Sequence, residues 1–166
     1  MIVYFDKLAD TSKIWIYQAD RFIHVDEEKA LTESLTAFCN QWTAHGQVLR
    51  TSFKIEHHYF IILGVDESYS NASGCSIDGS VHMLKAFQQQ WNLDFFDRRI
   101  AFFVNNEVKT YPMPDVKAFF KNRELDETSM FFNNSITSKS ELSSNWLIPV
   151  KGSWLARHLP DTVVVS

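Results

Sequence analysis

The chain has 166 residues, a net charge of −4 at neutral pH, 45% hydrophobic residues and 14% aromatic residues. This length and apolar content fit one folded domain and exclude an intrinsically disordered protein. The negative charge and the lack of a Lys/Arg cluster in the sequence argue against nucleic acid as a partner, because phosphate binding usually requires a basic stripe.

The cysteines and the apolar runs of the sequence indicate where in the cell the protein is located. The chain has two cysteines, Cys39 and Cys75, too few for a disulfide scaffold, and we interpret them as free thiols in a reducing compartment. The first ten residues lack the basic and apolar regions of a signal peptide. The longest apolar runs, 59–65 and 100–104, are too short to cross a bilayer. We therefore predict a soluble, cytoplasmic protein with no membrane partner.

The first half of the chain alternates strand and helix patterns. Alternating residues predict a strand over 13–18, and a helix follows from Asp26 as N-cap, with Gly46 placed to end it. A clean alternation over 49–56 predicts a half-buried strand. The run 59–65 is apolar on both faces and predicts a central strand.

The second half begins with a polar loop and a helix from Cys75 or Ser76 to Trp91. Strands are expected at 100–104 and 108–111, joined by a turn at 105–106, where Asn tolerates positive φ. A short helix at 114–121 and two short helical pieces within 141–159 complete the pattern.

This order predicts an α+β fold with a ferredoxin-like βαββαβ core and one extra edge strand. We expect a single domain over 1–166, with its core at about 13–111 and a C-terminal elaboration at about 112–166. The sheet should be mainly antiparallel, with 14–17 and 59–65 as neighbouring strands.

A candidate site follows from this topology. The first helix ends, the central strand ends and the second helix begins at one edge of a ferredoxin-like sheet. Unpaired N–H groups at a helix start attract anions. We therefore predict a small-molecule or anion site at the start of the second helix, and the residues expected to bind are Glu67, Ser73, Gly74, Ser76 and Asp78.

Cys75 adds the possibility of thiol chemistry at this edge. A helix N-terminus stabilises a thiolate, His45 could accept its proton, and Asp66 could orient the imidazole. The same residues also fit structural roles: Cys75 as a small buried residue, and Asp66 with Glu67 as the point where a strand leaves the core. Whether the protein is an enzyme stays open.

No cofactor or metal is predicted. The nucleotide-binding motif G-x-x-x-x-G-K-[ST] is absent. His45, Asp66, Glu67 and Asp78 carry metal-binding groups, but they lack the spacing of a dedicated ligand set.

Several short segments carry a family resemblance. They are Lys13-Ile14-Trp15-Ile16-Tyr17-Gln18, Gln41-Trp42-Thr43-Ala44-His45-Gly46, Val65-Asp66-Glu67-Ser68, Ser73-Gly74-Cys75-Ser76-Ile77-Asp78, Asn145-Trp146 and Ser153-Trp154. Together they resemble an uncharacterised bacterial family whose members often carry the automatic label "ABC transporter ATPase". The resemblance extends over most of the chain and implies family membership without an established activity.

A competing hypothesis is a non-catalytic interaction module that uses aromatic residues of the sheet. RNA-recognition modules stack bases on aromatic residues of equivalent strands, and Trp15 and Tyr17 lie on the first strand here. We expect instead that residues after Pro112 cover this face and bury both rings, because the aromatic residues of that segment also require burial.

Overall fold

The computed structural model describes residues 1–68 and 74–161, and of residues 74–76 it describes the backbone alone. Within these residues the protein is α+β, with three α-helices and antiparallel sheets. The chain forms two compact units, and the first consists of Met1–Asp97 and Asn134–Leu142. The second consists of Arg98–Asn133 and Ser143–Ser166. A single domain with an elaboration after residue 111 stays a prediction; the first passage between the units occurs earlier, after Asp97.

The first unit contains most of the predicted elements. Its helices and strands are η1 (Phe5–Lys7), β1 (Lys13–Gln18), α1 (Val25–Gln41), β2 (Thr43–Ala44), β3 (Gln47–Val48), β4 (Arg50–Glu56), β5 (Phe60–Asp66), α2 (Gly74–Trp91) and η2 (Lys139–Leu142).

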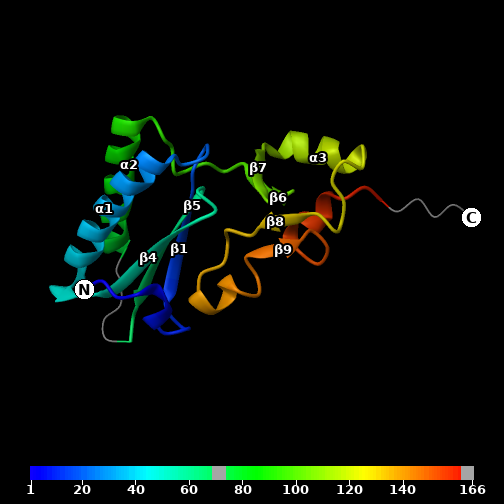
Figure 1. Ribbon diagram of the computed structural model, residues 1–166. Coiled ribbons are helices and arrows are strands. Elements are labelled where there is room, and N and C mark those ends of the chain that lie inside the picture. Colours follow the sequence, from blue (N-terminus) through cyan, green and yellow to red (C-terminus); the bar gives the residue numbers. More distant parts are fainter. Residues whose placement is uncertain (69–73, 162–166) are drawn as a thin grey trace, which may run out of the picture. The chain divides into compact units, whose positions relative to one another are not determined.

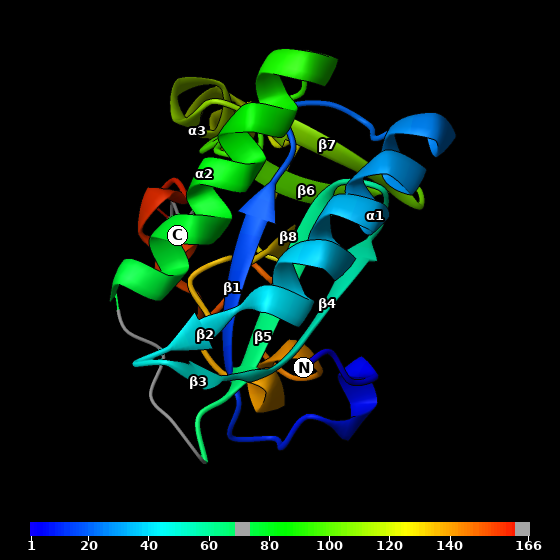
Figure 2. The ribbon, with the colours of Figure 1, turned by 90° about the vertical axis from the view of Figure 1, so that its left-hand side faces the viewer.

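The main sheet of this unit is antiparallel in the order β1-β5-β4. The predicted pairing of the first and central strands is thereby confirmed, with Ile16 opposite Ile62. Helices α1 and α2 lie side by side over one face of the sheet (Figures 1 and 2). Leu31 and Leu35 of α1 and Leu84 of α2 are fully buried there against Ile61 and Leu63 of β5.

Trp15 and Tyr17 lie on this helix-covered face, which corrects one expectation. Their strand partners Leu63 and Ile61 belong to the core between sheet and helices. Trp15 packs against Trp42 at the end of α1, with 5.9 Å between ring centroids. Tyr17 shares a hydrogen bond with Ser80 of α2. Burial of these rings by residues after Pro112 is therefore wrong, because the alternation places them under the two helices.

Helix α1 ends earlier than predicted. It begins after the N-cap His24, not at Asp26, and ends at Gln41. Residues 43–48 then form the short antiparallel hairpin of β2 and β3. His45 and Gly46 are its turn residues, with φ angles of 51° and 76°. Gly46 thus serves a hairpin turn that needs positive φ, and does not end the helix.

Arg21 connects the start of α1 to the end of α2. Arg21 donates two hydrogen bonds to the carboxylate of Glu27, at 2.8 and 2.7 Å. Glu27 also accepts a bond from the backbone N–H of His24, which caps the start of α1. Arg21 in turn donates to the carbonyls of Trp91 and Asn92, where α2 ends. This bidentate geometry is the strongest form of a side-chain ion pair.

The second unit has its own sheet and core. Its elements are β6 (Ile100–Val104), β7 (Glu107–Tyr111), α3 (Met113–Lys121), β8 (Met130–Phe132), β9 (Leu147–Pro149) and η3 (Trp154–His158). The antiparallel sheet has the order β7-β6-β8-β9. Asn105 and Asn106 both have positive φ, which confirms the predicted turn. The predicted short helix is present as α3.

Strand β6 does not join the β1-β5-β4 sheet, although a ferredoxin-like unit would place it beside β1. It pairs instead with β7 and β8. Beside β1, the structure has an isolated bridge between Gln18 and Phe96. In the part of the chain that the structure describes, no helix is both long enough and apolar enough to cross a membrane.

Candidate functional site

Asp66, the last residue of β5, is a buried carboxylate with 5% of its surface exposed. One of its oxygens accepts hydrogen bonds from the backbone N–H and the hydroxyl of Ser68. These bonds, helped by the charge of Arg50, lower the pKa of Asp66 below its ordinary value although burial opposes the shift. Asp66 is therefore a stable anion held by its own loop.

The other predicted polar residues lie on three different elements. His45 is exposed at the β2–β3 turn and forms no hydrogen bond with Asp66. The carboxylate of Glu67 lies 4.0 Å from the ammonium of Lys13. Asp78 is exposed on α2. Among the residues described, no three His, Cys, Asp or Glu side chains gather as metal ligands, so these four do not form a metal site.

The apolar neighbours of the predicted residues do converge. Trp42 and Ala44 flank the start of the hairpin, Val65 precedes Asp66, and Ile77 lies in the first turns of α2; all four pack in one cluster. Ser73 lies outside the described residues, as do the side chains of Gly74, Cys75 and Ser76. The helix-start site and the Cys75 nucleophile therefore remain predictions.

Arg50 is the residue that links Asp66 to a pocket. The two are cross-strand partners at the ends of β4 and β5. The guanidinium donates one hydrogen bond, from Nη2 to the carbonyl of Lys7 at 2.7 Å. Its Nε is buried and has no hydrogen-bond partner among the residues described. A guanidinium carries five N–H groups, so Arg50 retains donor capacity.

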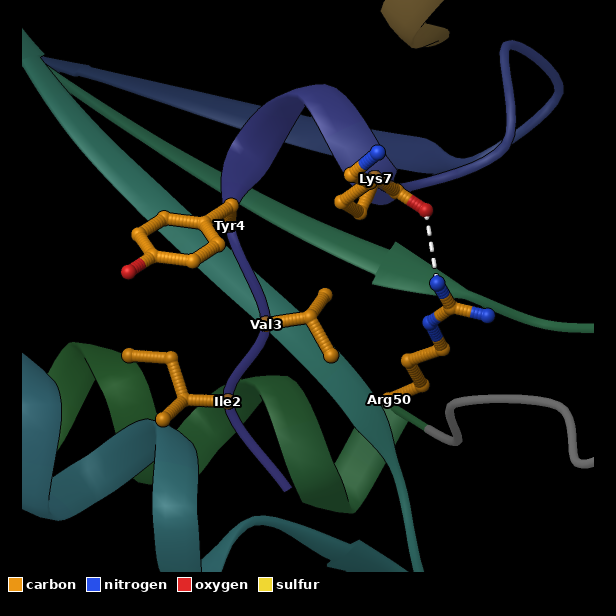
Figure 3. A pocket seen from close by; sticks show the side chains of 5 residues that line it. All are labelled: Ile2, Val3, Tyr4, Lys7 and Arg50. Carbon is orange, nitrogen blue, oxygen red and sulfur yellow. Dashed lines mark hydrogen bonds between the residues drawn. The ribbon is translucent and has the colours of Figure 1, made fainter.

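The pocket beside Arg50 has a volume of about 500 Å³. Figure 3 shows its five lining residues, with the side chain of Arg50 rising from β4 past Val3 toward Lys7. The other walls are Ile2 and Tyr4, and Tyr4 is 85% exposed. The pocket thus combines two cationic side chains with aliphatic and aromatic walls, and the structure pairs neither cation with an acidic side chain within the residues described.

The N-terminal segment forms most of this pocket because it is hydrogen-bonded along β4. The N–H of Val3 donates to the carbonyl of Thr51, and the N–H of Thr51 donates to the carbonyl of Met1, at 2.9 and 3.0 Å. The hydroxyl of Ser52 donates to the carbonyl of Val3 at 2.7 Å. Residues 1–3 therefore extend the sheet edge, with Ile2 bridged in parallel to Thr51.

Gly64 of β5 leaves room for Phe5 and Leu8, which continue the N-terminal segment. A Cβ built at Gly64 would lie 2.6 Å from Leu8 Cδ1 and 3.4 Å from Phe5 Cε2. Leu8 and Phe5 thus occupy the space that a side chain at position 64 of β5 would need. The ammonium of Lys139 donates to the carbonyl of Leu8 at 2.6 Å and holds the same turn. These contacts, before and after Lys7 in the chain, hold the pocket-lining segment in place.

Sequence reasoning missed Arg50 and Lys7. The alternation over 49–56 places Arg50 on the strand face opposite to Thr51, Phe53 and Ile55, where a solvent-facing residue is expected. The second face of the sheet is instead covered in part by Phe5 and Leu8, which pack over Gly64. The available signal was Gly64 itself, since a glycine inside an otherwise apolar strand indicates close approach of another chain segment.

A second pocket, of about 440 Å³, lies between α1 and the turn before β5. Its lining residues are Val25, Glu28, Lys29, Thr32, Glu33 and His58. The imidazole Nδ1 of His58 lies 2.7 Å from a carboxylate oxygen of Glu28. The histidine of this pocket already has an anionic partner, so the pocket offers weaker anion recognition than the one at Arg50.

No protein-family model, curated protein or solved structure matches this chain.

Proposed function

We propose that the first unit binds a small organic anion, such as a carboxylate with an apolar body, in the pocket at Arg50. The observation that carries this proposal is the Arg50 guanidinium, which donates one hydrogen bond from Nη2 within the protein, keeps further Nη–H donors, and lines an apolar pocket beside Lys7. Charge-assisted bonds from guanidinium to carboxylate are strong and directional. The aliphatic walls, together with Tyr4, supply the surface for the apolar part of the ligand.

This proposal keeps the class of ligand predicted from the sequence and moves the site. The start of α2 and thiol chemistry at Cys75, with His45 and Asp66, stay a second proposal that rests on sequence alone. The alternative of a non-catalytic interaction module on the aromatic sheet face stays a proposal with less support, because Trp15 packs against Trp42 and Tyr17 shares a hydrogen bond with Ser80.

Two further proposals concern the fold type and the family of the chain. We propose that β1, α1, β4, β5 and α2 are a ferredoxin-like unit without its last strand; the strand order β1-β5-β4 and the position of the helices support this. We also propose membership in the bacterial family named above, supported by the quoted segments. Neither proposal bears on the ligand.

The test is a titration of the full chain with phenylpropionate, its neutral amide and phenylethylamine, followed by ¹⁵N-edited NMR. Phenylpropionate should bind best and shift the amide signals of residues 2–7 and Arg50. Arg50→Gln should weaken its binding by at least about tenfold, since a hydrogen bond to a charged group contributes about 1.5–3 kcal/mol and about 1.4 kcal/mol is a factor of ten. Lys7→Gln should have a smaller effect.

The matched control is Lys85→Gln, which removes the same charge from an exposed position of α2 outside the pocket. It should bind phenylpropionate like the wild type. Tyr4→Ala, at a highly exposed position, should weaken binding without affecting folding. Equal binding of the acid and the amide, or unchanged binding by a folded Arg50→Gln variant, would reject anion recognition at this pocket.

A further inference from the structure

The second unit has an exposed tryptophan that its helix holds in place. The short helix η3 is capped by Ser153, whose hydroxyl oxygen accepts a hydrogen bond from the N–H of Leu155. Leu155 is fully buried in the core of the unit. Its neighbour Trp154 is 39% exposed, and its ring meets the buried Phe131 edge to face at 5.9 Å. The Trp154 ring thus contacts the core of the unit through Phe131 and is partly exposed to solvent.

Arg157 lies over the same ring. Its guanidinium carbon is 5.9 Å from the centroid of the Trp154 ring. Residues three apart are eclipsed in a 3-10 helix, which places the two side chains together. Arg157 is exposed, and a cation above an indole ring is weakly attracted to it. The helix therefore presents a partly exposed indole ring with a planar cation packed against it.

Helix α3 adds a third element to this surface. Val116 and Phe120 of α3 pack in the same core as Leu155, so the exposed Lys117, next to Val116, lies on the neighbouring part of the unit. Partial burial lowers the pKa of His158, and the charges of Lys117 and Arg157 lower it further, so the imidazole is neutral at neutral pH.

No acidic side chain of the described residues forms an ion pair with Lys117, Arg157 or His158. Cations that face one another without a counter-ion favour an anionic partner. An exposed tryptophan beside them favours a planar ring, because every nucleobase can stack on an aromatic side chain. Both preferences are met by one class of molecule, in which a flat base is attached to phosphate.

We propose that Trp154, Arg157 and Lys117 form a second binding site that takes a nucleotide, with the base on Trp154 and the phosphate on the two cationic side chains. No local pattern predicts this site, because Lys117 and Arg157 are far apart along the chain and only the packing of α3 and η3 in one core brings them to the same part of the unit. A free nucleotide and a single-stranded nucleic acid share this chemistry.

The experiment compares uridine monophosphate, uridine, inorganic phosphate and a fluorescein-labelled thymidine decanucleotide as probes of the full chain. Binding of the small probes is followed through the indole N–H signal of Trp154, and binding of the oligonucleotide through anisotropy. Uridine monophosphate should bind at least several-fold more tightly than uridine or phosphate. The oligonucleotide binds more tightly still if the natural ligand is a strand, and about equally if it is a free nucleotide.

Three variants separate base stacking from charge. Trp154→Leu should weaken binding of uridine monophosphate about tenfold, as expected for the loss of one stacked base. Arg157→Gln and Lys117→Gln should weaken the oligonucleotide and reduce the salt dependence of its binding. Lys109→Gln, an exposed position on β7, is the matched control and should change little.

Three results would overturn the proposal. The first is the absence of nucleotide binding at millimolar concentration. The second is equal binding of phosphate and uridine monophosphate, which would remove the base from the site. The third is wild-type affinity in both Trp154→Leu and Lys117→Gln. Arg157 and Lys117 are exposed, so their variants test the site even if Trp154→Leu unfolds.

Discussion

Arg50 and Asp66 are directly opposite each other on β4 and β5, yet they do not form an ion pair. Asp66 takes its hydrogen bonds from Ser68, whereas Arg50 donates to the carbonyl of Lys7. The acid thus stabilises the nearby positive charge without occupying its donors. This division of partners leaves the guanidinium at the wall of the pocket able to meet an external anion.

Replacing Asp66 by Asn should therefore strengthen binding of phenylpropionate. The change removes a negative charge close to the proposed ligand while the amide oxygen can still accept the bonds from Ser68. We expect the dissociation constant to fall about threefold, the size of a charge effect near a protein surface. Isothermal titration at low salt measures it. Weaker binding by a folded Asp66→Asn variant would show that Asp66 positions Arg50 and does not merely compete with the ligand.

The ion pair between Arg21 and Glu27 predicts a specific pH dependence of stability. Arg21 lowers the pKa of Glu27 from 4.5 to about 2 through its hydrogen bonds, and the backbone bond from His24 adds to this. Because the folded state has the lower pKa, the stabilisation is complete above pH 4.5 and is lost as the pH falls toward 2. It amounts to about 2–3 kcal/mol.

Urea unfolding of Glu27→Gln, measured at pH 7 and at pH 3, tests this pH dependence. The variant should be less stable than the wild type by about 2–3 kcal/mol at pH 7, and the gap should narrow at pH 3. Glu28→Gln removes the exposed pair with His58 and should cost less than about 1 kcal/mol. A gap for Glu27→Gln that is equal at both pH values would contradict the assigned pKa.

Gly64→Ala should disturb the N-terminal segment and the pocket together. The added methyl group would come within 2.6 Å of Leu8 Cδ1, and such overpacking costs about 1–3 kcal/mol. Gly79→Ala is the control, since the closest atom there is Phe38 Cε2 at 3.2 Å. Thermal unfolding and phenylpropionate binding should both be impaired at Gly64 and less so at Gly79. In Gly64→Ala/Leu8→Ala the two losses of stability should be less than additive.

Thiol alkylation separates the two cysteines. Burial raises the pKa of Cys39 to about 11, despite the opposing hydrogen bond from Thr51. Cys39 should therefore resist iodoacetamide at neutral pH in the folded protein, and rapid labelling should disappear in Cys75→Ala. A midpoint for Cys75 below the free-thiol value, of about 8.5, would support a reactive thiolate. If His45→Ala leaves that midpoint unchanged, the two residues do not act as a pair.

Local patterns in the sequence carried much of the fold. The β4 alternation, the doubly apolar β5 and the Asn105–Asn106 turn are short-range signals, and each has its expected counterpart in the structure. The predicted end of the first helix was wrong because a glycine can either end a helix or form a hairpin turn. At Gly46 the pairing of β2 with β3 decided the outcome.

The candidate site was harder to predict because it depends on long-range packing. Arg50 on an alternating strand is typical of a solvent-facing residue, and Gly64 on the neighbouring strand indicates close approach of another segment without identifying it as the N-terminal residues. The β6 strand likewise has ordinary strand composition, and its choice between two sheets depends on partners, Phe131 among them, that lie far along the chain.

The Nη–H signals of Arg50 in a ¹⁵N-edited spectrum at low temperature, assigned by their loss in Arg50→Lys, test the anion site most directly. In the free protein Nη2 donates to the carbonyl of Lys7, and the remaining Nη–H groups should lack the downfield position of a charge-assisted bond. Phenylpropionate should move these signals downfield in a saturable manner, with the same dissociation constant as the shifts of residues 2–7, and the neutral amide should not. Signals that stay in place while phenylpropionate binds would contradict the account.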